Sequence, residues 1–410
     1  MKILQITKKF PYPVKDGEVI GILNLTMGFA ALGHEVTVLS LNTRKHYFNP
    51  KELPASIQKI ARFIAVEIDT KLNPVKAFVN LFTNESYNIE RFYSKEFEQK
   101  IVAILEQEHF DFVLLEGIYL MRYINVLKKT LNAKLPTPNS VLPTKIVLRP
   151  QNVEYVIWER LCDTETNPFK KWYLALLAKR MKAFEIMQMN QADLLIPVSQ
   201  TDLDIFKQKG CHLPSIAIPT GYVYDALPAI DSDMEENAVA FIGGMDWMPN
   251  REGVEWFLDK VWVKVLTQLP HAKFYLAGRN FPDEIRTLQM KGLVIVGEVE
   301  DAKAFISSKA ISIVPLFAGS GMRVKIVEAM ALGRAVISTS IGAESLAYTH
   351  GKDILIADDA QTFADEVVRV LSNKTLRLSL GNFAQQLVEE VYDNRKISQR
   401  ILDFVKLAKA

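Results

Sequence analysis

Cysteine is scarce in this chain of 410 residues, and long apolar runs are missing. Only Cys162 and Cys211 are present, which excludes a disulfide framework or a cysteine-rich metal site and fits a reducing compartment. No run reaches the roughly 18 apolar residues that a membrane-spanning helix needs. The 6 histidines show no i,i+4 ligand spacing, so the sequence predicts no protein metal site.

An excess of charge of one sign is also lacking. The chain has 49 basic and 47 acidic residues and a net charge of +2, which gives no global argument for a nucleic-acid partner. Before Lys8 and Lys9 the N-terminus holds too few apolar residues for the core of a secretion signal. We therefore expect a cytoplasmic protein, with a peripheral contact at the inner face of the membrane left open.

The length and the order of the predicted elements indicate two α/β domains. Residues 2–6 predict a strand, residues 19–32 a helix and residues 35–39 a second strand, which is a βαβ unit. A similar series begins at residues 238–242, after an acidic stretch at 231–237 that predicts a linker. The segment 45–107 predicts an insertion with helices.

We expect both domains to be Rossmann-like, with parallel sheets that face a central cleft. The predicted boundaries are 1–200 for the first domain and 201–390 for the second, with a helix at 391–410 that returns to the first domain. In open α/β sheets, ligands bind beyond the carboxyl ends of the strands, so the loops that follow the strands should hold the site.

A glycine loop in the second half is the strongest single motif. The predicted strand 310–314 ends in a Gly-Ser-Gly loop that opens into a helix carrying Arg323, Lys325 and Glu328. Backbone N–H groups and the positive end of the helix dipole suit phosphate, and two cations with one carboxylate suit a sugar diphosphate. The alternative is an ordinary βαβ crossover in which Lys325 and Glu328 form an i,i+3 surface pair.

The segment GSGMRVKIVEAMALGRAVISTSIGAE resembles the donor-binding signature of retaining glycosyltransferases of family 4, which have the GT-B fold. Other segments resemble the family in the same order: LGHEVTVLSL, RPQNVE, ADLLIPVS, IPTGYVYD and FIGGMDWMPNREGVEWF. The resemblance implies transfer of a sugar, with retention, from a nucleoside-diphosphate sugar to a glycan, polysaccharide or lipid-linked acceptor. It implies no cofactor, because the nucleotide sugar is the substrate, and it suggests cell-envelope polysaccharide synthesis.

The family's donor helix has two glutamates eight residues apart. The second matches Glu328, which the resemblance assigns to the ribose hydroxyls, whereas the first falls at Ser320, so that carboxylate is absent. Many relatives also carry an arginine where Gly244 stands here. We therefore hypothesise that Arg323 and Lys325 take over the diphosphate, and Arg323, Lys325 and Glu328 are the catalytic candidates.

The remaining donor-side candidates lie on loops that follow predicted strands. They are Gly17, Gly243, Gly244, Asn250, Gly278, Val299, Gly319, Ser320, Gly321 and Met322. Glycines permit a close approach of the backbone to phosphate, and Asn250 is predicted to cap the next helix. The resemblance places the backbone near Val299 at the nucleobase. For Trp247, buried packing is the expected outcome.

Four polar residues are candidates for the acceptor side, because they follow strands of the first domain. They are Asp16, Glu116, Asn152 and Glu154. For Asp16 the alternative is a plain turn before a helix. For Glu116 it is a loop carboxylate whose hydrogen bonds are satisfied within the protein.

Lysines interleave with aromatic residues around Phe169 and Trp172. Such a helix either rests on anionic lipid or packs on the sheet while its lysines reach water, and the packing interpretation is favoured. Two functions compete with a transferase. One is an isomerase similar to UDP-sugar 2-epimerases, which share the fold, and the other is a non-catalytic protein that binds nucleotide sugars or glycans.

Overall fold

The computed structural model describes residues 1–14, 16–71, 73, 79–80, 82–83, 85–133, 143–223, 234–319 and 322–408. The chain forms two compact units, Met1–Gly221 with Asn394–Ala410, and Tyr222–Asp393. The first unit continues past residue 200 because the following segment pairs with its sheet. Ile216 N donates to Leu195 O at 3.2 Å and Ile218 N to Pro197 O at 2.9 Å.

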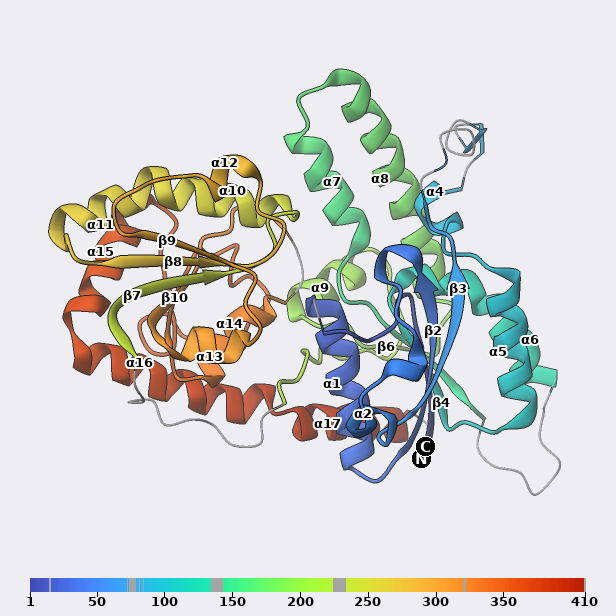
Figure 1. The fold of residues 1–410 in the computed structure, drawn as a ribbon. Helices are drawn as coiled ribbons and strands as arrows, with labels where there is room; N and C mark the ends of the chain where they lie inside the picture. The colour runs from blue at the N-terminus through green and yellow to red at the C-terminus, as the bar shows by residue number, and fades with distance from the viewer. Residues whose placement is uncertain are drawn as a thin grey trace. The chain divides into compact units, whose positions relative to one another are not determined.

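The first unit is built on a six-stranded parallel sheet in the order β3-β2-β1-β4-β5-β6 (Figure 1). The strands are β1 (Lys2–Thr7), β2 (Glu35–Thr43), β3 (Arg62–Ile68), β4 (Phe112–Glu116), β5 (Lys145–Arg149) and β6 (Leu194–Leu195). Apolar runs form the central strands because both faces are covered by helices. The order reverses between β1 and β4, which makes their carboxyl ends the switch point of this sheet.

The expectation of an insertion with helices at 45–107 was incomplete. This segment contributes the edge strand β3 as well as α5 (Lys95–Gln107). The short elements around them are two 3₁₀ turns (Arg44–His46 and Pro50–Glu52), α2 (Ala55–Gln58) and α4 (Tyr87–Glu90). Among the described residues, the other helical elements of the first unit are α1 (Gly17–Ala31), the 3₁₀ segment η3 (Ile118–Tyr123), α6 (Ile124–Ala133), α7 (Glu154–Thr164), α8 (Pro168–Met189), α9 (Gln200–Gln208) and α17 (Asn394–Leu407).

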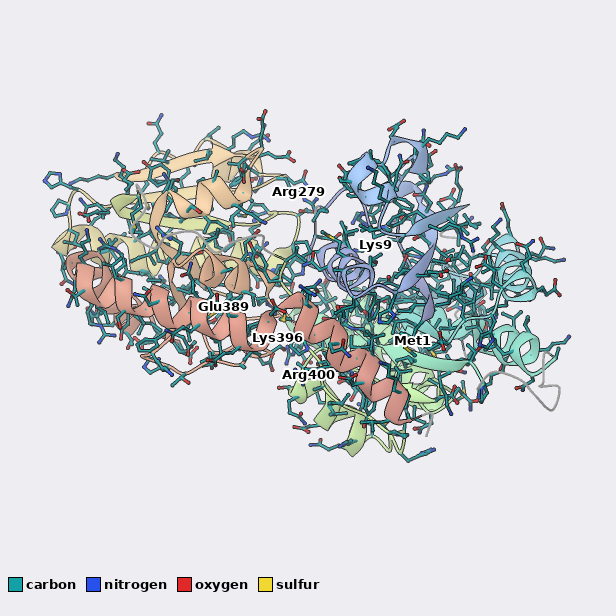
Figure 2. All side chains as sticks on the ribbon, turned by 90° about the horizontal axis from the view of Figure 1, so that it is seen from below. Met1, Lys9, Arg279, Glu389, Lys396 and Arg400 are labelled. Carbon is teal, nitrogen blue, oxygen red and sulfur yellow. The ribbon has the colours of Figure 1, made fainter. Side chains whose placement is uncertain are left out.

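The last helix, α17, packs against α1, and Figure 2 marks Lys396 and Arg400 along it. The two helices approach closely at Gly28, where an added Cβ would lie 2.0 Å from Ser398 Oγ. Ile397 and Ile401 of α17 are fully buried in the core beneath them. The C-terminal helix thus belongs to the core of the first unit although the second unit precedes it in sequence.

The second unit repeats the strand order of the first. Its strands are β7 (Glu235–Ile242), β8 (Lys273–Ala277), β9 (Leu293–Gly297), β10 (Lys309–Val314), β11 (Ala335–Ser338) and β12 (Leu355–Ile356). All pairs are parallel, in the order β12-β11-β10-β7-β8-β9. The switch point therefore lies between β7 and β10, the strand that leads into the glycine loop.

The acidic stretch 231–237 is not a linker throughout, because Glu235 already opens β7. Its carboxylate lies 2.8 Å from Lys273 Nζ and 3.5 Å from Lys309 Nζ, so lysines of the neighbouring strands compensate its charge. Residues 231–233 lie outside the described residues.

Helices cover the second sheet. They are α10 (Met248–Trp256), the π-helical turn Phe257–Trp262, α11 (Val263–Gln268), α12 (Asp283–Arg286), α13 (Ala302–Ser307), α14 (Val324–Ala331), α15 (Ala360–Ser372), α16 (Lys374–Leu387) and a second π-helical turn, Val388–Tyr392. Among the helices of both units that the structure describes, none is long and apolar enough to cross a bilayer.

Candidate functional site

Three strand ends of the second unit meet at glycines. Gly243 N donates to Ala277 O at 3.0 Å, and Gly278 N donates to Gly297 O at 2.8 Å. Gly278 has a φ of 142°, and a Cβ on it would lie 1.9 Å from Gly243 O. Only glycine at position 278 therefore allows the ends of β7 and β8 to approach this closely.

Lys325, in the first turn of α14, reaches the loop that follows β7. Its Nζ lies 2.9 Å from Asn250 Oδ1, and Asn250 Nδ2 donates to Gly244 O at 2.8 Å. A Cβ on Gly243 would lie 2.8 Å from Lys325 Nζ. The missing side chain at Gly243 thus leaves room for the ammonium group beside the switch point.

The expectation that Asn250 caps a helix was wrong. Helix α10 begins at Met248 and is preceded by Trp247, so Asn250 lies inside its first turn. Its buried amide instead joins α10, the β7 loop and Lys325.

Arg323 lies directly before α14, which begins at Val324 rather than at Arg323. Its side chain is buried, and its guanidinium carbon lies 5.3 Å from the centre of a Trp247 ring. Gly319, with a φ of 113°, is again needed, because a Cβ there would lie 2.5 Å from Arg323 Nη2. Trp247 is 39% exposed, so the expectation of buried packing for this residue was wrong.

The charge of Arg323 affects the pKa of Lys325. Burial and, to a smaller extent, the nearby charge of Arg323 together lower the pKa of Lys325 to about 7. A buried lysine beside a second cation is stabilised by any anion that binds there, since the anion favours the protonated form. The arrangement is therefore suited to an anionic ligand.

Glu328 lies on the same helix as Lys325 but in different surroundings. Burial raises the pKa of Glu328, Lys303 lowers it and Asp301 raises it. Glu328 in turn adds to the effect of burial in raising the pKa of Tyr222. Among the described ion pairs, none joins Lys325 to Glu328, so the i,i+3 surface pair is not formed.

The remaining donor-side candidates lie in other parts of the two units or outside the described residues. Val299 is partly buried after the end of β9, Gly17 is the exposed first residue of α1, and the side chain of Met322 packs against the core. Ser320 and Gly321 lie outside the described residues.

In the first unit, two lysines that follow β1 meet carboxylates. Lys9 Nζ lies 2.9 Å from Asp16 Oδ1 and 3.0 Å from Glu18 Oε2, and Lys8 Nζ lies 3.5 Å from the same Glu18 oxygen. Asp16 also caps α1, because its Oδ1 accepts from Val19 N at 3.0 Å. Figure 2 labels Lys9 in this unit and Arg279 in the second.

The pKa values of these groups reflect their pairing. Burial alone would raise the pKa of Glu18 and of Asp16, but the neighbouring lysines hold both below their ordinary values. Burial lowers the pKa of Lys8, yet Glu18 and Glu154 outweigh it and raise the value above the ordinary one. The charges of the two lysines thus stabilise the ionised carboxylates, and the carboxylates stabilise the ammonium group of Lys8.

Glu154, at the start of α7, joins the same cluster. Tyr119 OH donates to Glu154 Oε2 at 3.0 Å, and Lys8 Nζ lies 3.8 Å from Glu154 Oε1 and 4.5 Å from the Tyr119 ring centre. Asn152 is partly buried in the loop between β5 and α7. Asp16 and Glu154 thus belong to one polar cluster, which lies at the carboxyl edge of the first sheet.

Glu116 does not face an open surface. It is fully buried, and its oxygens accept from Gln5 Nε2 at 2.9 Å and from Gln151 Nε2 at 2.8 Å. Burial raises its pKa, which the Arg149 guanidinium at 3.8 Å lowers in part. The alternative of a satisfied carboxylate fits this geometry, and contact with an acceptor does not.

Lys8 and Lys9 were not among the site residues predicted from the sequence. A usable signal was present, because a basic pair directly follows a buried strand and precedes a loop with Asp16 and Glu18. Polar residues at the carboxyl end of a switch-point strand are candidates for a ligand site in any open α/β sheet.

Among the described residues, no group of three or more His, Cys, Asp or Glu is arranged to hold a metal ion.

Residues 236–373, within the second unit, match the family model described as glycosyl transferases group 1. Over the whole length, the chain is 25% identical to an uncharacterized 44.6 kDa protein in the cps region of Klebsiella pneumoniae, with 98% of each chain covered. The residues that match this model include Arg323, Lys325 and Asn250.

Solved structures show the fold of the whole chain. Sucrose-phosphate synthase of Thermosynechococcus elongatus matches with a TM-score of 0.69 and 15% identity, covering 99% of both chains. TarM of S. aureus, in a complex that includes UDP, matches with a TM-score of 0.68 and 12% identity over 98% of this chain and 99% of TarM. Two parallel six-stranded sheets and these neighbours confirm the expected GT-B fold.

Proposed function

We propose that this protein is a retaining glycosyltransferase that moves a hexosyl group from a nucleoside-diphosphate sugar to a saccharide or lipid-linked hydroxyl acceptor. The observation that carries the proposal is the pair Arg323 and Lys325, held beside glycine-built strand ends at the β7/β10 switch point. The family match of the second unit supports it, as does the UDP in the TarM complex.

The proposed mechanism is electrostatic. The diphosphate that leaves the sugar gains negative charge in the transition state, and preorganised cations there accelerate the reaction. Hydrogen bonds to charged groups contribute about 1.5–3 kcal/mol each. In this proposal Arg323 and Lys325 bind the diphosphate, Glu328 accepts from the ribose hydroxyls, and the loops at Gly243, Gly278, Gly319 and Val299 supply backbone contacts. We assign no carboxylate as a covalent nucleophile and propose no cofactor.

On the acceptor side, the proposal keeps Asn152 and Glu154, which lie at the carboxyl edge of the first sheet. Asp16 and Glu116 receive a supporting role, because their oxygens are engaged by Lys9 and Val19 and by Gln5 and Gln151. We further propose a cytoplasmic location and a role in cell-envelope polysaccharide synthesis, which the relative named for a cps region supports.

The first test is a thermal-shift screen of nucleoside diphosphates and their sugars. A ligand that binds the folded state raises stability by RT ln(1 + [L]/Kd), so the correct donor should raise the melting temperature. Isomerisation of a UDP-sugar without acceptor would favour the epimerase instead. A shift without turnover on any acceptor or water would favour a binding protein.

The second test is Arg323→Ala in a donor-dependent turnover assay. Loss of one preorganised donor at developing charge lowers turnover by about 100-fold or more. The matched control is Arg369→Ala on α15, whose guanidinium pairs with Glu366 at the surface. Wild-type turnover in the Arg323 variant would refute the assigned role, and the anomer of the product, read by NMR, tests retention.

A further inference from the structure

Helices α7 and α8 form a hairpin that projects from the first unit (Figure 1). At its base, Tyr155 of α7 and Met181 of α8 are buried in the unit's core. From residue 156 to residue 176 the described side chains are all partly or fully exposed. The outer half of the hairpin is therefore held mainly by the packing of its two helices on each other.

The tip of this hairpin, residues 161–172, presents large apolar side chains to solvent. Phe169 is 84% exposed and Trp172 is 61% exposed. Asn167 fixes the start of α8, because its Oδ1 accepts from Phe169 N at 3.0 Å and from Lys170 N at 3.1 Å. At i,i+3 spacing, Phe169 and Trp172 then share one side of the helix.

This end of the helix departs from the packing interpretation of the sequence, which holds farther along α8. Met181 packs in the core as that interpretation expects, whereas Phe169 and Trp172 pack on nothing that would bury them. Lys170 and Lys171 are exposed between them. Aromatic side chains with lysines beside them suit the interface of a bilayer, where rings enter the headgroup region and ammonium groups reach lipid phosphates.

We propose that the tip of the α7–α8 hairpin docks onto an anionic lipid bilayer. Within the tip, the cations Lys170 and Lys171 equal the carboxylates Asp163 and Glu165 in number, and both lysines adjoin the aromatic pair in sequence. Glu165 is in addition engaged by the loop, since its Oε1 accepts from Asn167 N at 2.8 Å. The aromatic pair supplies most of the affinity, and the lysines supply a preference for anionic headgroups.

A second copy of the chain fits this surface less well. Two aromatic side chains bury roughly 300–500 Å² together, which is below the roughly 800 Å² per partner of a standard interface. A symmetric contact would also bring the lysines of both copies together. A bilayer needs no such matched surface.

Docking at the tip would place the membrane near the proposed acceptor edge. Glu154 begins α7 and belongs to that edge, and Thr164 ends the helix. Ten residues at the α-helical rise span about 15 Å. A saccharide on a lipid carrier would then be held close to Glu154. This consequence rests on the proposed function, whereas the membrane contact itself does not.

The test is co-sedimentation of the full chain with vesicles, without any sugar nucleotide. We expect binding to phosphatidylcholine vesicles that contain about one third phosphatidylglycerol, and weaker binding to phosphatidylcholine alone. The double variant Phe169→Ala with Trp172→Ala should lower the partition coefficient by at least about tenfold. Lys170→Glu with Lys171→Glu should remove the preference for phosphatidylglycerol.

Matched controls lie elsewhere in the first unit. Leu407→Ala removes a 75% exposed apolar side chain from α17, and Lys95→Glu with Lys100→Glu reverses two exposed charges on α5. Both should bind vesicles as the wild type does. Circular dichroism and the melting temperature show whether each variant folds.

Three outcomes would overturn the proposal. The wild type stays in the supernatant with both kinds of vesicle, or the tip variants sediment as the wild type does. Alternatively, light scattering shows a wild-type dimer that the aromatic variant dissociates, without vesicle binding, which would make the tip a self-association surface. Because no assay here uses donor or acceptor, failure leaves the transferase proposal unaffected.

Discussion

The two units share one strand order, but the lysines at their switch points have different electrostatic surroundings. In the first unit, Lys8 and Lys9 meet the carboxylates of Asp16 and Glu18. In the second, Lys325 donates to the neutral amide of Asn250 and lies near the charge of Arg323. The pKa of Lys8 is raised by its partners in spite of burial, whereas that of Lys325 is lowered to about 7.

This difference distinguishes the first unit, where carboxylates neutralise the lysines, from the second unit, where Lys325 has no carboxylate partner among the described ion pairs and suits an anionic ligand. A lysine that already faces carboxylates gains little from a phosphate, because the carboxylates must first be displaced or shared. A buried lysine beside another cation gains much, because the ligand supplies its counter-charge. In our proposal, the loops that follow the shared strand order therefore determine which unit binds the diphosphate.

The largest expected effect separates Lys325 from Lys9. Lys325→Ala should lower donor-dependent kcat/KM by about 100-fold or more, because a cation at the leaving diphosphate acts mainly in the transition state. Lys9→Ala should lower it less than about tenfold, since Lys9 neutralises Asp16 and Glu18 rather than a phosphate. Steady-state kinetics on both variants provides the measurement, and similar losses would erase the contrast between the units.

The next effect is the pH dependence of donor affinity. Lys325 is protonated below its pKa of about 7, so affinity for an anionic donor should be highest on the acid side and fall as pH rises. Between pH 6 and pH 8.5 the protonated fraction falls about thirtyfold, which sets the expected loss of affinity. Calorimetric titration with a nucleotide sugar measures it, because a diphosphate esterified at both ends keeps its charge over this range.

Lys325→Arg is the matched control for this profile. Arginine stays charged throughout the range, so the affinity of this variant for the nucleotide sugar should vary little with pH. A wild-type profile that is flat from pH 6 to pH 8.5 would contradict the assignment of a weakly basic Lys325 to the donor site.

A smaller effect follows from giving Lys325 the kind of partner that Lys9 has. Asn250→Asp places a carboxylate where Lys325 Nζ now meets Oδ1 at 2.9 Å. We expect the midpoint of the pH profile to rise above 7 and donor affinity at pH 7 to fall by about tenfold, since part of the positive charge is neutralised. Asn250→Ala removes the same contact without adding charge, so its midpoint should move much less.

The sequence allowed the architecture to be predicted because its central strands are short apolar runs bounded by glycine and proline. The runs at β1, β2, β4 and β7 each belong to a buried strand of a parallel sheet. The edge strand β3 was missed because RFIAVEI mixes charged with apolar residues inside a segment rich in Pro and Asn. An edge strand needs less apolar surface, so its local pattern is weaker.

Part of the candidate site could likewise be predicted from the sequence, and part could not. The glycine loop and its cations were visible as a local motif, with Arg323 and Lys325 two residues apart. Their partners were not, because Lys325 meets Asn250 across 75 residues of sequence and Arg323 meets the ring of Trp247 from another loop. Contacts between loops of different strands follow from the sheet order, which a single sequence does not specify.

The smallest expected effect concerns Asp16→Asn, which removes one charge from the cluster around Lys8 and Lys9 and keeps a capping side chain. The Asp16 carboxylate has a lowered pKa and lies 2.9 Å from Lys9 Nζ, so it stabilises the fold above its unfolded pKa. That contribution, about 0.5–1 kcal/mol, is lost as pH falls from about 4 through the folded pKa. In denaturant unfolding at pH 7 the wild type should therefore have the higher free energy of unfolding, and the difference from the variant should shrink as pH falls below about 4.

Asp359→Asn is the control for this variant, because Asp359 caps α15 in the second unit through Gln361 N and Thr362 N. Donor-dependent kcat/KM should change less than about threefold in both variants, since neither carboxylate meets the donor in our assignment. A folded Asp16→Asn protein that loses turnover by more than about tenfold would break the comparison. The carboxylates around Lys9 would then take part in the reaction, and their role would no longer be limited to neutralising Lys8 and Lys9.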